Sequence, residues 1–132
     1  MPHGLTMLAD AYRISGAVEV ALAHLDEAQR LAEATGVRWI LSEALRLRGD
    51  LQAQTGNDMA ADASYRDAVG IARRQRAKLF ELRSETSLAR LWRDQGKHAE
   101  ARELLAPLYA WFTEGFDAPD LVEAKALLQE LA

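Results

Sequence analysis

Apolar residues recur along this chain at the three- and four-residue intervals of helices that bury one face. Near the C-terminus one such stripe runs through Leu121, Ala124, Leu127, Leu128 and Leu131. The same spacing predicts helices near residues 3–15, 18–35, 38–55, 59–75, 79–95, 98–114 and 118–131. The chain is rich in alanine, leucine, glutamate and arginine and has only three prolines, which is a helix-forming composition. We therefore expect an all-helical fold without β-strands.

The pattern repeats with a period of 40 residues. In each block a glycine separates two predicted helices, where a left-handed cap or tight turn favours a residue without Cβ. Equivalent positions are Gly16, Gly56 and Gly96; Ala9, Gly49 and Ala89; Ala11, Leu51 and Leu91; Ala21, Ala61 and Ala101; Leu25, Tyr65 and Leu105; Ala28, Ala68 and Leu108; and Leu31, Ile71 and Trp111. We expect one domain of three helix hairpins, over about residues 1–37, 38–77 and 78–116, and a capping helix over about 118–131.

Two local features modify this picture. Pro107 lies inside a predicted helix, where it removes one backbone hydrogen bond, and we expect a kink because the apolar pattern continues across it. The aromatic residues Trp111, Phe112 and Phe116 follow, and a terminal repeat needs a cover. The stripe of the closing helix is the favoured cover, and a groove for a partner is the alternative.

Composition narrows the function classes. At 132 residues the chain is long enough to bury a hydrophobic core without disulfides or structural metal ions. It has no cysteine, which excludes disulfides and thiolate chemistry, and it has no apolar run of the roughly 18 residues that span a bilayer. The start of the chain does not resemble a signal peptide. The formal charge of −4 gives no pull toward nucleic acid or anionic membranes. We expect a cytoplasmic protein that binds neither nucleic acid nor membranes.

No catalytic constellation is present. The phosphate-binding glycine motifs are missing, and His3, His24 and His98 are far apart and outside metal-binding spacings. Carboxylates are numerous but occupy helix faces rich in arginine, where solvated ion pairs are expected. We therefore expect no cofactor, no metal and no enzymatic activity from this chain alone.

Basic residues cluster near the end of the fourth predicted helix. They could hold a phosphate or an acidic helix, but cations at a helix C-terminus also complement its dipole, and the dipole explanation is favoured. The cluster comprises Arg66, Arg73, Arg74, Arg76 and Lys78.

The repeated positions can be compared with a known signature. Leu8-Ala9 with Tyr12, and Leu88-Ala89 with Trp92, stand at its Leu-Gly and Tyr places, while Arg48-Gly49 with Gln52 is a partial match. Its Ala-Phe-Ala places are held by Ala21-Leu25-Ala28, Ala61-Tyr65-Ala68 and Ala101-Leu105-Leu108. Over nearly the whole chain the pattern resembles tetratricopeptide repeats, which have 34 residues. The resemblance implies a right-handed α-solenoid, and the period of 40 implies helices longer by nearly a turn each.

A second resemblance lies in four segments, residues 45–51, 87–96, 105–109 and 111–117. They look like the C-terminal repeat region of large bacterial signalling proteins, in which an adenylate or guanylate cyclase or a DNA-binding domain precedes an ATPase domain and a helical array. The resemblance implies that this chain is the terminal part of such a protein, whose catalytic domains lie outside these residues.

In tetratricopeptide arrays the first helices of the repeats line a groove that receives peptides. Carried over position by position, the resemblance places candidate partner contacts at Arg13, Glu43, Arg46, Asp50, Arg83, Arg90 and Arg93. The arginines of the third repeat suit carboxylates or acidic segments through charge-assisted hydrogen bonds. The alternative is that these are ordinary solvated positions.

Two functions remain open. The first is a protein–protein interaction or regulatory scaffold that binds a protein, a peptide or other domains of its own polypeptide. The second is a small-molecule or nucleotide sensor whose ligand enters the groove. Loss of a preceding repeat would expose Leu5, Leu8, Val18 and Leu22, so we also expect a homodimer through the N-terminal hairpin.

Overall fold

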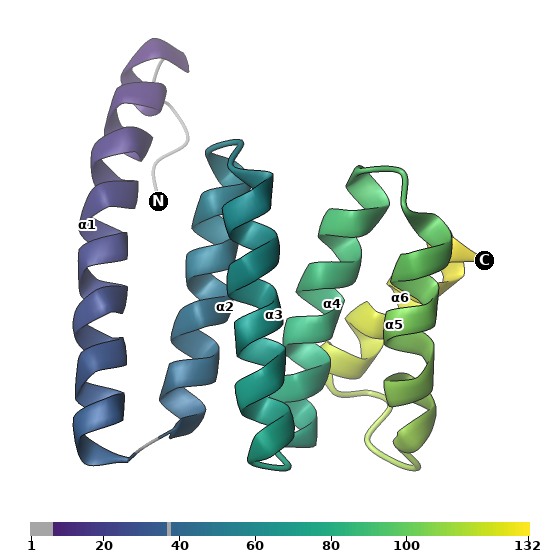
Figure 1. The fold of residues 1–132 in the computed structure, drawn as a ribbon. Coiled ribbons are helices and arrows are strands. Elements are labelled where there is room, and N and C mark those ends of the chain that lie inside the picture. Colours follow the sequence, from purple (N-terminus) through teal and green to yellow (C-terminus); the bar gives the residue numbers. More distant parts are fainter. Residues whose placement is uncertain (1–6, 37) are drawn as a thin grey trace.

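The computed structural model describes residues 7–36 and 38–132, and side chains within it from residue 19 onward except 38 and 39. This part of the chain is all-helical, as predicted, and has no strand. Its helices are α1 (Met7–Thr35), α2 (Arg38–Gln54), α3 (Asp58–Arg74), α4 (Lys78–Asp94), α5 (His98–Trp111) and α6 (Pro119–Leu131). Figure 1 shows α1 to α5 standing side by side, with α6 behind α4 and α5.

The predicted turns between helices are formed at two of the repeated glycines. Gly56 and Gly96 both have φ +82°, a conformation that a residue with Cβ rarely adopts. Asn57 then caps α3, because its side-chain oxygen accepts a hydrogen bond from the backbone N–H of Ala60 at 3.4 Å. Since α2, α3, α4 and α5 begin at residues 38, 58, 78 and 98, each helix and its turn occupy the same length of chain.

The first expected hairpin is not formed. Residues 7–35 make one continuous helix through Gly16, so the helices predicted at 3–15 and 18–35 are merged over the described residues. A glycine inside a helix costs only about 1 kcal/mol. At Gly56 the break is stabilised by the Thr55 hydroxyl, which donates to the Leu51 carbonyl, and by the Asn57 cap, whereas Ala17 stands at the place of Asn57 and has no capping group. The described fold therefore has two hairpins, α2–α3 and α4–α5, flanked by α1 and α6.

The C-terminal helices also depart from expectation. Helix α5 continues through Pro107, as the apolar pattern predicted, but it ends at Trp111 rather than near 114. The apolar stripe of α6 is buried against α4 and α5, in one cluster with Leu82, Leu105 and Leu108. Trp111 nevertheless remains 57% exposed, so α6 does not cover it as predicted.

Helix contacts place α2, α4 and α6 in a row. Helix α2 contacts both α3 and α4, and α4 contacts α5 and α6. The positions of α6 also follow the 40-residue register, because Leu131 lies 40 residues after Leu91 and both are buried. Helix α6 is thus equivalent to α2 and α4, and we refer to the three as the α2–α4–α6 row.

One row of the repeat explains a close contact between helices. A Cβ on Gly49 would lie 2.5 Å from a ring carbon of Tyr65, which is buried on α3. At the same positions of the next repeat, Ala89 and Leu105 belong to one buried cluster. Where the large tyrosine ring packs, the facing residue is glycine, and where the smaller leucine packs, the facing residue is alanine.

Candidate functional site

The structure brings six of the seven predicted groove residues onto two neighbouring helices. Glu43, Arg46 and Asp50 lie on α2, and Arg83, Arg90 and Arg93 lie on α4. Arg13 lies on α1, and its side chain is outside the described residues.

Arg83 connects the three helices of the row. Its Nη1 donates to Oε1 of Glu43 on α2 at 2.9 Å, and its Nη2 donates to Oδ2 of Asp120 on α6 at 2.8 Å. Arg46 donates to the same Glu43 oxygen at 2.7 Å. Burial would raise the pKa of Glu43, but the hydrogen bonds from Arg46 and Arg83 outweigh burial and hold this pKa below its ordinary value. Asp120 is the first cause of a raised pKa at Arg83. These side chains are held in place as links between helices.

The remaining arginines of α4 also face carboxylates. Nη1 of Arg93 lies 2.7 Å from Oε2 of Glu130, and Nη2 of Arg90 lies 3.6 Å from Oε2 of Glu123. Asp120, Glu123 and Glu130 were missed because α6 was treated as a cap rather than as a further repeat helix. The 40-residue register could have predicted two of these residues, because Glu123 and Glu130 lie 40 residues after Arg83 and Arg90.

This pairing changes the charge expected of the site. In the ion pairs described, the arginines of the row are matched by a larger number of carboxylates. They are Arg46, Arg83, Arg90 and Arg93 against Glu43, Asp50, Asp94, Asp120, Glu123 and Glu130. Within this ion-pair network the carboxylates outnumber the arginines by six to four, so the network does not favour the acidic partner that the arginines alone suggested.

A cleft of about 320 Å³ lies between α2 and α4. It is lined by Asp50, Ala53, Gln54, Tyr65, Ser87, Arg90, Leu91 and Asp94. The Tyr65 hydroxyl donates to Oδ1 of Asp50 at 2.5 Å. Burial, and then this hydrogen bond, raise the pKa of Tyr65, so its hydroxyl stays protonated at neutral pH. The cleft offers fixed donors and acceptors for binding.

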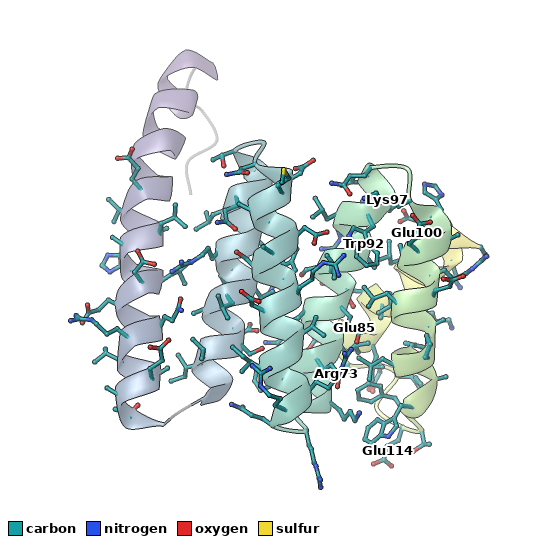
Figure 2. The ribbon with its side chains drawn as sticks, in the orientation of Figure 1. Arg73, Glu85, Trp92, Lys97, Glu100 and Glu114 are labelled. Atoms are coloured by element: carbon teal, nitrogen blue, oxygen red, sulfur yellow. The ribbon has the colours of Figure 1, made fainter. Side chains whose placement is uncertain are left out.

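A second polar feature, absent from the sequence predictions, is a buried pair of carboxylates on α4. Glu81 and Glu85 are 4% and 2% exposed. Arg73 of α3 reaches both, with Nε 3.1 Å from Glu81 and Nη2 3.1 Å from Glu85, and Figure 2 shows Arg73 and Glu85 between neighbouring helices. Burial and the charge of Glu81 raise the pKa of Glu85 to about 7, although Arg73 opposes this. Glu85 is therefore partly protonated at neutral pH.

The basic cluster of the sequence is dispersed by these contacts. Arg73 faces the buried carboxylates, and Arg66 pairs with Asp62 while lying 5.1 Å above the ring of Trp92. Trp92 in turn donates from Nε1 to Asp62 at 2.7 Å, which joins α4 to α3. Arg66 and Arg74 also line a pocket of about 280 Å³, but the carboxylates of Glu33 and Asp67 line it with them.

Comparisons with protein-family models, curated proteins and solved structures found no match for this chain. Over residues 7–36 and 38–132, no helix combines the length and the apolar character needed to cross a bilayer. Within the same described residues, no three histidine or carboxylate side chains are grouped so that they could hold a metal ion.

Proposed function

We propose that this chain is a tetratricopeptide-like interaction module that binds a protein or peptide segment across the α2–α4–α6 row. The observation that carries the proposal is the alignment of three equivalent helices, joined by Arg83, with a polar cleft between two of them. Interhelical ion pairs keep the row in one geometry, and a preorganised surface loses less entropy when a partner binds.

The excess of carboxylates in this ion-pair network favours a segment with lysine or arginine side chains. Asp94 and Glu123 are 63% and 62% exposed, so they can exchange their intramolecular arginine partners for those of a ligand. Asp50 and Glu43 are less exposed and bonded within the row, and they serve to shape it. Affinity for such a partner should fall with rising salt.

The absence of cysteine in the sequence is consistent with a reducing, cytoplasmic environment. The partner is then a cytoplasmic protein or another domain of the polypeptide to which the chain belongs. The resemblance to bacterial signalling proteins supports the second source.

Photo-crosslinking in cells tests the proposal. A photoreactive residue replaces Ala53, which lines the cleft, and in a matched control it replaces Ala99, which is exposed on α5 outside the row. We expect adducts from position 53, lost on Glu123→Lys and retained on Glu103→Lys, which changes the charge on α5 instead. Equal adducts from both positions, or adducts indifferent to Glu123→Lys, contradict the proposal.

The cleft volume also allows a small ligand, which defines the competing function. A nucleotide or metabolite that binds only the folded chain raises its melting temperature with concentration. Such a response, abolished by Arg90→Ala, supports the sensor in place of the interaction module.

A further inference from the structure

A second groove lies between α1 and α2, next to the cleft, and the two share Asp50 and Gln54 at their common edge. Its volume is about 600 Å³, and it is lined mainly by apolar side chains together with His24, Asp50 and Gln54. The apolar lining residues are Ala21, Leu25 and Ala28 of α1 and Leu47 and Leu51 of α2. Leu47 is 41% exposed, which leaves an apolar surface open to water.

The 40-residue register shows that the repeat normally buries this surface. Each apolar lining residue is at least partly exposed, whereas its equivalent in the next repeat is buried. Those equivalents are Ala61 at 0%, Tyr65 at 3%, Ala68 at 0%, Ser87 at 6% and Leu91 at 7% exposed.

The difference comes from one helix. Helix α2 contacts both α3 and α4 and so covers their junction, and α4 covers the junction of α5 and α6 in the same way. Among the described helices, none contacts both α1 and α2. The groove is therefore the place of a missing first helix.

The sequence that matches this place is the N-terminal half of α1. Residues 7–14 stand in register with residues 47–54 of α2 and 87–94 of α4, and residue 15 with the first residue after each helix. Ala9 stands where Gly49 packs against Tyr65 and where Ala89 shares a buried cluster with Leu105. Leu25 lines the groove at the place equivalent to Tyr65 and Leu105. A leucine at this place leaves room for an alanine, as Leu105 does for Ala89.

The chain's own copy of this segment does not occupy the groove. Helix α1 is continuous through Gly16, and Figure 1 shows its N-terminal part extending past the end of α2. We propose that the groove receives residues 7–15 of a second copy of this chain, in a reciprocal exchange that forms a two-fold dimer. Exchange of an identical element satisfies both grooves with contacts that the repeat already encodes.

A cysteine pair tests this assignment, because the natural chain has no cysteine. We expect Ala9→Cys/Leu25→Cys in a thiol–disulfide buffer to form a covalent dimer on a non-reducing gel. The control pair Ala9→Cys/Ala23→Cys, with its second site exposed elsewhere on α1, should not form it. An intrachain disulfide, which indicates a segment folded back on its own groove, overturns the proposal, and so does the absence of any disulfide.

Sedimentation at several concentrations provides a second measurement that does not depend on disulfide geometry. Leu47→Glu places a charge in the groove and should raise the dimer dissociation constant by at least about tenfold. Leu79→Glu on α4 changes a residue of nearly equal exposure, 40% against 41%, and should leave the constant unchanged. A strict monomer, or equal effects of the two variants, overturns the proposal.

Discussion

The buried carboxylate Glu85 gives the sharpest test of the structure. It is 2% exposed, lies beside Glu81, and leaves its Oε1 without a hydrogen bond in the described structure. Glu85→Gln keeps the shape and removes the charge. Its pKa of about 7, against an ordinary 4.5, corresponds to about 3 kcal/mol in the free energy of unfolding.

The sign of the pH dependence follows from which state binds the proton. Between pH 4.5 and about 7 the folded protein holds a proton on Glu85 that the unfolded chain has released. The free energy of unfolding therefore falls as pH rises through this window and levels off above it. Glu43 and Asp62, whose folded pKa values are lowered, act in the opposite direction, with stability lost only as pH falls below their ordinary pKa values.

Urea denaturation followed by circular dichroism, at intervals from pH 5 to 8.5, measures this effect. Wild type and Glu85→Gln should have similar stability at pH 5, and the variant should be more stable by up to about 3 kcal/mol at pH 8. Glu103→Gln, an exposed carboxylate on α5, serves as the control and should follow the wild-type profile. A Glu85→Gln profile parallel to that of wild type would show that the pair is not coupled to folding as described.

Three further predictions use the same denaturation assay. Gly49→Ala should destabilise the fold by about 1–3 kcal/mol because its Cβ meets the Tyr65 ring, and Tyr65→Leu should cost less in that background than in wild type; additive costs would refute the packing explanation. Gly56→Ala, at φ +82°, should destabilise by about 1–2 kcal/mol, whereas Gly70→Ala inside α3 should stabilise by about 0.5–1 kcal/mol. If both substitutions change stability in the same direction, the left-handed conformation of Gly56 and the helical one of Gly70 are contradicted. Arg83→Met should lower stability by about 1–2 kcal/mol because partly buried Asp120 loses its ion-pair partner and Glu43 keeps only Arg46, and an unchanged midpoint would show that the link is not needed.

The helices were predictable because their signals are local. Helical spacing, the left-handed turns at Gly56 and Gly96 and the cap at Asn57 depend on residues close in sequence. The first hairpin was predicted wrongly because Gly16 matched the repeated row, yet α1 continues through it. A glycine in register makes a turn possible and does not require one.

The candidate site was predictable only in part. The register placed Glu43, Arg83 and Arg90 on adjacent helices, but it could not show that α6 would supply carboxylates to them. Those pairs depend on how α6 packs against α4, which is a long-range consequence of the fold. The buried pair on α4 was missed because carboxylates near arginine were interpreted as solvated.

Comparison along the α2–α4–α6 row shows that the fold does not require these buried acids. The position of Glu81 is held by Leu41 in α2 and by Leu121 in α6, and all three are buried. Likewise Leu45 in α2 stands at the place of Glu85. Because leucines fill these positions in α2 without an electrostatic cost, the two acids lower the stability that α4 would have with apolar residues there, and they make it depend on pH. The same helix carries Arg83 and Arg90, so a change of pH near neutrality acts directly on the helix that forms the centre of the proposed binding surface.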